Sequence, residues 1–286
     1  MIRIAFIGAG TVGTALAVRL KEKGYSIVAV ASGSLKSAQN LAKMVFGCRV
    51  YADKQAAVDD AELIFITTPD DAIPKVVAEL KWRPGQMVVH CSGADSVDVL
   101  EPARKSGALV GTFHPLQTFA NVTRAIENMS GSTFALEGDP KLLPILRQMA
   151  TDLEGHWIEL KPGDKVLYHA AAVMACNYFV TLVKLSTDLW QTFGVSSEQA
   201  TQALVPLLQG TVNNLEKIGL PNCLTGPVAR GDIGTISKHI AALKKAAPAA
   251  LPVYRQLTLE TIPIALAKGR LTKERAEQIR KLVEEE

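Results

Sequence analysis

Short apolar runs alternate with amphipathic segments through the first half of the chain. Apolar runs of strand length occupy residues 2–7, 27–30, 49–51, 63–67, 87–90, 108–112, 133–136 and 157–160. Helical periodicity fills the intervals at residues 14–20, 35–46, 73–80, 97–105 and 142–153. Strands that alternate with crossover helices are typical of a parallel sheet with helices on both faces. The pattern therefore predicts an α/β fold whose doubly wound sheet is parallel for at least its first five strands.

The pattern changes after the Lys-Pro-Gly sequence at residues 161–163. From there to the C-terminus no period-2 alternation occurs, and long helical patterns are interrupted by glycine and proline. The sequence thus predicts two domains, residues 1–161 and an all-helical domain over residues 162–286. The longest apolar stretch, residues 170–183, is shorter than the ~20 residues of a membrane-spanning helix, and we interpret it as a buried helix.

A glycine-rich turn follows the first predicted strand and opens the first predicted helix. Gly8, Gly10 and Gly13 have the GxGxxG spacing, with Thr11 and Val12 between the last two glycines. In dinucleotide-binding folds these glycines permit a tight turn, a close approach of the backbone to a pyrophosphate and close packing of helix on strand. The helix N-terminus adds unpaired N–H groups that favour an anion. The motif predicts a Rossmann dinucleotide site at these five residues, and its alternative is an accidental glycine turn.

The loop after the second predicted strand bears on which dinucleotide is bound. A site for NAD keeps a carboxylate here, ~20 residues beyond the glycines, to hold the ribose 2′-hydroxyl. This chain has Ser32, Ser34 and Lys36 instead, whose hydroxyls and ammonium would hold a 2′-phosphate. The sequence therefore favours NADP(H) as the cofactor over NAD(H). The serines can equally cap the helix that begins near Leu35.

Two more loops follow strands of the predicted sheet, at the edge where ligands of open α/β sheets bind. Thr68 and Pro69 follow the fourth strand, and Ser92 and Gly93 follow the fifth. We expect the first pair to line the path of the pyrophosphate and the nicotinamide ribose, and the second pair to lie near the nicotinamide. The acidic pair at residues 70–71 is interpreted as a helix N-cap.

Three polar residues are candidates for catalysis. His114 follows the sixth predicted strand and precedes a proline, so it can hold a proton near a substrate or bond a backbone carbonyl at the domain junction. His169 and Asn177 stand in an alanine-rich apolar helix, where an unpaired polar group is costly. Each of the two therefore faces either a substrate cleft or a buried structural network.

A glycine-rich loop at residues 224–232 offers candidates for substrate binding. Arg230 can hold a substrate carboxylate with its planar guanidinium, and Thr225 stands in the same loop. Alternatively, Arg230 pairs with Asp232, which is placed to N-cap the helix that follows.

Composition and charge narrow the choice of partners. A formal net charge of +3 over 286 residues is too small to predict binding to nucleic acid or to an anionic membrane. The four cysteines form no CxxC pair, so neither a metal site nor a disulfide framework is expected. The N-terminus enters a strand with no apolar signal segment, which predicts a cytoplasmic protein. A small molecule is therefore the expected substrate.

Several motifs together resemble those of an uncharacterised family of bacterial Rossmann-like oxidoreductases. The motifs are GAGTVG, VASGSLKSA, TTPDDAI, HCSGA, FHPLQTF, YHAAAVMACNY and TGPVARGD. That family joins an NADP-binding domain to a helical C-terminal domain of unknown function, and its members often carry Ser-Arg-Ser where this chain has Gly33 between two serines. More distantly, the chain is similar to pyrroline-carboxylate reductase and the 3-hydroxyacid dehydrogenases. The resemblance implies a homodimer formed through the helical domain.

Two functional hypotheses follow. The first is an NADP-dependent oxidoreductase that transfers a hydride between the nicotinamide and a C=O or C=N group of a small, carboxylate-bearing metabolite. In it, His169 or His114 supplies the proton, Asn177 orients the substrate and Arg230 holds its anionic end. The second is a non-catalytic sensor that binds NADP(H) and signals to a partner, and it is motivated by the absence of an unmistakable catalytic pair.

Overall fold

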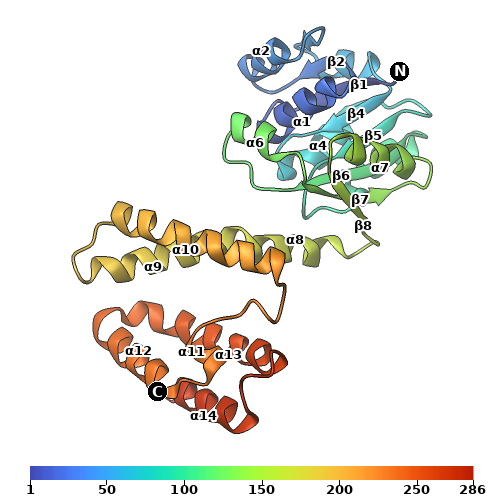
Figure 1. Ribbon diagram of the computed structural model, residues 1–286. Coiled ribbons are helices and arrows are strands. Elements are labelled where there is room, and N and C mark those ends of the chain that lie inside the picture. Colours follow the sequence, from blue (N-terminus) through green and yellow to red (C-terminus); the bar gives the residue numbers. More distant parts are fainter. Residues whose placement is uncertain (286) are drawn as a thin grey trace. The chain divides into compact units, whose positions relative to one another are not determined.

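The computed structural model describes residues 1–285 and divides into two compact units, Met1–Cys176 and Asn177–Glu286. Figure 1 shows a sheet flanked by helices in the first unit and helices in the second. The first unit includes helix α8 (Lys165–Ala175), which sequence analysis assigns to the second domain. The predicted domain boundary after residue 161 stays a prediction.

The first unit is built on an eight-stranded sheet with the order β3-β2-β1-β4-β5-β6-β7-β8. Its strands are β1 (Arg3–Ile7), β2 (Ser26–Ala31), β3 (Arg49–Tyr51), β4 (Leu63–Ile66), β5 (Met87–His90), β6 (Leu109–Leu116), β7 (Thr133–Gly138) and β8 (His156–Glu159). All pairs are parallel except β6–β7, so the predicted doubly wound α/β fold is confirmed.

Helices connect these strands and cover both faces of the sheet. They are α1 (Thr11–Glu22), α2 (Leu35–Met44), α3 (Lys54–Asp59), α4 (Ile73–Glu79), α5 (Glu101–Lys105), α6 (Val122–Asn128) and α7 (Leu143–Asp152), with short 3-10 helices at Asp70–Ala72 and Val97–Leu100. Helices α3 and α6 are absent from the sequence prediction. Two residues of α3 and one residue of α6 are buried, so neither short helix has an apolar face that its sequence reveals.

A separate hydrophobic core lies on each face of the sheet. Alternate residues of each buried strand enter one core or the other, as the period-2 geometry of a strand requires. On one face the rings of Phe6, Phe65, Phe113 and Phe134 form a continuous row with centroids 4.5 to 6.0 Å apart. This double burial explains why the central strands have nearly continuous apolar sequences.

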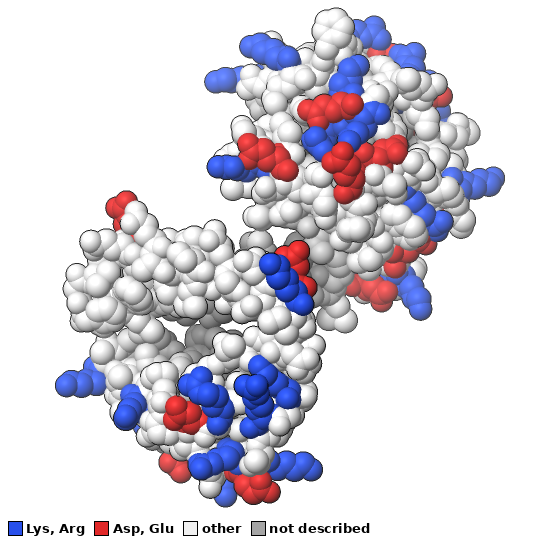
Figure 2. Space-filling view, viewed as in Figure 1, with Lys and Arg blue, Asp and Glu red and all other residues white. Residues whose placement is uncertain are grey.

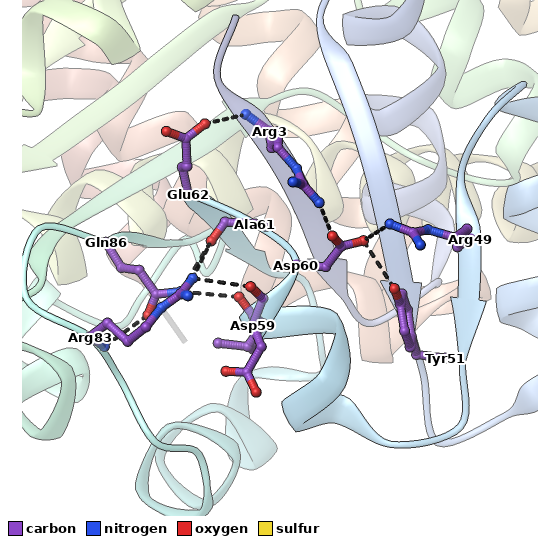
Figure 3. A network of polar contacts seen from close by, with 10 residues as sticks. Arg3, Arg49, Tyr51, Asp59, Asp60, Ala61, Glu62, Arg83 and Gln86 are labelled. Atoms are coloured by element: carbon purple, nitrogen blue, oxygen red, sulfur yellow. Dashed lines mark hydrogen bonds and ion pairs between the residues drawn. The ribbon is translucent and has the colours of Figure 1, made fainter.

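A polar network fixes the amino ends of the strands (Figure 3). Asp60 forms an ion pair with Arg3, accepts a hydrogen bond from Arg49 at 2.6 Å and accepts another from the Tyr51 hydroxyl at 3.0 Å. Arg83 donates to the carbonyl oxygen of Ala61 at 3.1 Å. These contacts tie β1, β3 and β4 together at the edge opposite the glycine turn, which leaves the carboxyl edge free for function.

The sixth strand is longer than predicted. It extends through His114 to Leu116 and pairs antiparallel with β7, with His114 opposite Ala135. The expectation that His114 lies in a loop after the strand is therefore wrong. Proline at position 115 masks the strand in the sequence, but a proline is tolerated in a strand where its missing N–H is not needed.

The second unit consists of helices α9 (Asn177–Gln191), α10 (Ser197–Lys217), α11 (Pro227–Arg230), α12 (Ile233–Ala246), α13 (Leu251–Ala267) and α14 (Lys273–Glu284), and a 3-10 turn at Pro248–Ala250. Helices α11 to α14 enclose a small core around Ile236, Ile262 and Ile279. Asp232 caps α12 by accepting a hydrogen bond from the Thr235 N–H at 3.0 Å, as predicted. The predicted all-helical character of this part of the chain is confirmed.

One helical segment, Lys165–Gln191, is long and apolar enough to cross a membrane by length and composition alone, and its most apolar window contains no buried residue. The prediction that residues 170–183 form a buried helix is therefore wrong, since each of them is exposed or half-buried. Figure 2 shows that the surface over α9 and α10 is nearly free of charged side chains in that view. Apolar sequence alone does not distinguish a core helix from a helix whose apolar face lies at the surface.

Candidate functional site

The glycine turn has the geometry that its sequence predicts. Gly8 adopts a φ of 113°, and a Cβ built on it would lie 2.5 Å from the carbonyl carbon of Thr67. A Cβ on Gly13 would collide with the Thr67 hydroxyl and with the Gly8 carbonyl oxygen at 2.7 Å. Only glycine fits at these two positions, because β1, α1 and the end of β4 meet there. Gly10 has no neighbour within 4 Å of such a Cβ, so its backbone faces open space.

A cavity of about 400 Å³ opens beside this turn in the first unit. Six of the predicted cofactor residues line it, namely Gly8, Gly10, Ser32, Ser34, Thr68 and Pro69. The predicted Thr11, Val12 and Gly13 lie in the first turn of α1, whose N-cap Gly10 offers no side-chain acceptor to the free N–H groups. The predicted Lys36 is exposed and does not line the cavity, whereas Lys54 does.

The residues around the cavity fit a dinucleotide. Its lining contains no carboxylate, and the buried Thr68 hydroxyl has no partner among the described residues. Free N–H groups at the start of α1, which is long enough to carry a helix dipole, favour a pyrophosphate. Ser34 accepts a hydrogen bond from the Ser37 N–H at 3.2 Å, so the predicted capping role is confirmed and its hydroxyl proton stays free to donate.

Asp70 links the cavity to a second group of polar residues. Its carboxylate accepts a hydrogen bond from the Ser92 hydroxyl at 2.8 Å, while its neighbour Pro69 lines the cavity. Neither acidic residue at 70–71 makes a side-chain cap hydrogen bond, so the N-cap prediction is wrong. The Ser92 hydroxyl also accepts from the N–H of Asp95 at 3.0 Å, and Ser92 is therefore held firmly.

Two histidines and a tyrosine surround Gly93. The Tyr168 hydroxyl lies 2.8 Å from Nδ1 of His114, and the rings of His114 and His169 are 6.0 Å apart. A Cβ on Gly93 would lie 2.8 Å from Nε2 of His114 and 2.9 Å from Cε1 of His169. The structure thus brings together three segments that are distant in the sequence, because His114 and His169 lie beside the loop of Ser92 and Gly93.

Lys165 contacts this cluster through Ser92, although the sequence does not predict it as a site residue. Its side chain is 1% exposed, and its ammonium donates a hydrogen bond to the Ser92 carbonyl oxygen. Burial lowers the pKa of Lys165 to about 8, although Glu137 and other acidic groups nearby favour its charged form. A lysine at the start of an apolar helix is ordinarily a solvated residue, so nothing in the sequence marks this one as buried.

His90 and His114, which both lie near Lys165, are neutral at pH 7. Burial and the charge of Lys165 lower the pKa of His114 to about 4 and that of His90 to about 3. Nδ1 of His90 accepts from the Ser92 N–H at 3.2 Å, so its Nε2 carries the proton and donates to the Ser96 carbonyl oxygen at 3.1 Å. His90 therefore has the structural role that its place in a strand suggests.

The remaining predicted residues belong to the second unit. Asn177 is the first residue of α9, and Thr225 is an exposed loop residue. Arg230 is largely exposed and lies 4.0 Å from Asp232, which supports the alternative that these two residues pair. Their predicted roles toward a substrate stay predictions.

Family models match both parts of the chain. Residues 1–115 match a Rossmann-like domain, and residues 132–261 match a domain of unknown function, DUF2520. The chain joins a Rossmann-like domain to a DUF2520 domain. This combination agrees with the family resemblance of the sequence motifs. No curated protein matches the chain.

Solved structures share this architecture over nearly the whole length. A provisionally assigned NADP oxidoreductase from Bacteroides fragilis is 25% identical with a TM-score of 0.72, over 92% of this chain and 98% of that one. A protein from Thermotoga maritima is 26% identical with a TM-score of 0.66, over 98% of both chains. A reductive aminase from Aspergillus terreus in complex with NADPH and ethyl levulinate is 17% identical with a TM-score of 0.66, over 98% and 99%. At that identity the last likeness shows the fold alone.

Proposed function

We propose that this chain is an NADP-dependent oxidoreductase that transfers a hydride between the nicotinamide and a C=O or C=N group of a small, carboxylate-bearing metabolite. The observation that carries the proposal is the contact between Asp70 and Ser92, because it joins the dinucleotide cavity to the histidine cluster within one compact unit. Solved structures of this fold include an NADPH complex, which supports the choice of coenzyme. Bound NADPH supplies the hydride.

The cluster around Gly93 supplies the proton chemistry. The Tyr168 hydroxyl lies 2.8 Å from Nδ1 of His114, and we propose that it donates there, which places the proton of a neutral His114 on Nε2, the atom near Gly93. From there it can donate to the oxygen or nitrogen on which charge develops, as a neutral imidazole does in other enzymes. His169 is the second proposed proton carrier, and its Nδ1 is buried without a partner among the described residues. The roles of Asn177, Thr225 and Arg230 toward the substrate are part of the proposal.

The exposed apolar surface of the second unit supports a homodimer. Val180, Leu207 and Val212 are each more than half exposed on α9 and α10, and Phe179 and Val205 border a shallow groove there. Exposed apolar patches of this kind mark sites of association. We propose that a second copy covers this surface in a cytoplasmic homodimer, without a role for membrane or nucleic acid.

A substrate screen tests the proposed activity. Small oxo acids, hydroxy acids and cyclic imines are assayed for NADPH oxidation or NADP reduction at 340 nm. We expect a substrate whose turnover is lost in His114→Ala or His169→Ala while NADPH binding is kept. Full turnover in both variants would remove the histidines from the mechanism. NADPH binding with no turnover on the whole panel would favour the sensor hypothesis.

A further inference from the structure

Lys54 is the one charged residue among the described residues that line the cavity beside the glycine turn, and no sequence motif singles it out. We propose that Lys54 binds the 2′-phosphate of NADP(H) and thereby sets the preference of this chain for NADP(H) over NAD(H). This inference rests on the proposed function, since it concerns the coenzyme of that same site.

The sheet register brings Lys54 close to the serine loop. Strands β2 and β3 are parallel neighbours, and their last pair joins Ala31 to Tyr51. The segments that leave the two strands, Ser32–Ser34 and 52–54, therefore start side by side at the carboxyl edge. Both segments contribute to the cavity lining. A cation from the second segment thus complements hydroxyls from the first, which is the combination that holds a phosphate dianion.

Neighbouring contacts fix the backbone that carries Lys54. Asp53 caps α3 by accepting a hydrogen bond from the Gln55 N–H at 3.0 Å. The Gln55 amide in turn donates to the Lys81 carbonyl oxygen at 3.0 Å and accepts from the Lys81 N–H at 2.8 Å. Helix α3 is therefore anchored to the segment after α4, and the start of the Lys54 side chain is held at the cavity.

The ammonium of Lys54 is available to a ligand. Its ion pair with Glu79 has a separation of 3.7 Å, and both side chains are more than one-third exposed. Such exposed ion pairs contribute little to stability, so the Lys54 ammonium can readily leave Glu79 for another anion. Lys36, the residue that the sequence favours for this role, is exposed and does not line the cavity, whereas its neighbour Ser37 does.

The test compares the two reduced coenzymes. Dissociation constants of NADPH and NADH are measured by calorimetry at fixed ionic strength for the wild type, Lys54→Gln and the matched control Lys36→Gln. We expect Lys54→Gln to weaken NADPH binding by roughly 10- to 30-fold, because a charge-assisted contact is lost, and to leave NADH within about threefold. Lys36→Gln leaves the preference unchanged, and Lys54→Arg restores it. The same dissociation constants are measured for adenosine 2′,5′-bisphosphate and 5′-AMP, which differ in the 2′-phosphate and contain no nicotinamide.

Three outcomes would overturn the assignment. Equal weakening of NADPH and NADH in Lys54→Gln would place Lys54 at another part of the coenzyme. Loss of the preference in Lys36→Gln alone would assign the phosphate to the α2 lysine. An unchanged NADPH affinity in a folded Lys54→Gln variant would remove the residue from the site. Failure of the wild type to bind either coenzyme would instead refute the proposed function, and this inference with it.

Discussion

Burial of Lys165 predicts how the stability of the first unit depends on pH. The folded chain binds the Lys165 proton less tightly than the unfolded chain does, because burial lowers the pKa from its ordinary value of 10.5 to about 8. Between these two values the unfolded state binds more protons, so the free energy of unfolding rises with pH. Lys165→Met removes this contribution. It also removes a charge that lowers the pKa of His90 and His114, but burial, the larger cause, still holds both pKa values below 6.5, so neither histidine titrates between pH 7 and pH 10.5.

The size of the effect follows from the two pKa values. Each tenfold difference in proton affinity is worth about 1.4 kcal/mol, so the full contribution is about 3 kcal/mol. Most of it is gained between pH 8 and pH 10.5. We therefore expect the difference in unfolding free energy, wild type minus Lys165→Met, to increase by about 3 kcal/mol from pH 7 to pH 10.5. The loss of the hydrogen bond to Ser92 lowers the stability of the variant by the same amount at both pH values, so it does not affect this increase.

The assay must report on the first unit alone. A Trp190→Phe background leaves tryptophans only at positions 82 and 157, both in the first unit, so that urea unfolding followed by fluorescence monitors that unit. Lys161→Met, at an exposed position, serves as the matched control. We expect the control difference to stay within about 0.5 kcal/mol across the same pH range.

A difference between wild type and Lys165→Met that does not change with pH would refute the reasoning. It would mean that the ammonium keeps its ordinary proton affinity and is solvated in the native state. A difference that falls with rising pH would mean that acidic neighbours raise the pKa of Lys165 in the folded chain more than burial lowers it.

Two further predictions concern the cluster and the second unit. Gly93→Ala should lower turnover about 100-fold, because the added Cβ displaces His114 and His169. The dissociation constant of NADPH should stay within about threefold of the wild-type value. Turnover equal to that of the wild type would show that the two rings can move aside without cost. Val212→Glu should convert a dimer into a monomer in light scattering, with unchanged circular dichroism, because it places a charge on the exposed apolar surface. The control Lys245→Glu, at an exposed position elsewhere in that unit, should leave the dimer intact. A Val212→Glu variant that is still a dimer would place the interface elsewhere.

The parts of the fold that sequence predicts well are those with a strict local requirement. Gly8 and Gly13 could be assigned from spacing because their roles depend on backbone clashes between segments that the motif itself defines. Ser34 and Asp232 are helix caps as predicted, since capping involves residues only three positions apart. The central strands were found because burial on both faces leaves them continuously apolar.

The parts that could not be predicted depend on contacts between distant segments. Lys54 reaches the cavity through the register of β2 and β3, and Asp70 meets Ser92 across two strand ends instead of capping a helix. The pairing of Tyr168 with His114 joins residues that are 54 positions apart. None of these contacts alters the local pattern of hydrophobic and polar residues, so periodicity contains no trace of them.

The electrostatics of the cluster explain how its groups divide the proton chemistry. Lys165, His90 and His114 occupy one buried region, where more than one positive charge is strongly disfavoured. Lys165 has the highest affinity for a proton, with a pKa of about 8, and it suppresses the pKa of both histidines. At pH 7 the region therefore holds one ammonium and neutral imidazoles. With Nδ1 accepting from Tyr168, the neutral His114 presents its N–H at Nε2 toward Gly93, and the same nitrogen takes the proton back when hydride transfer runs in reverse.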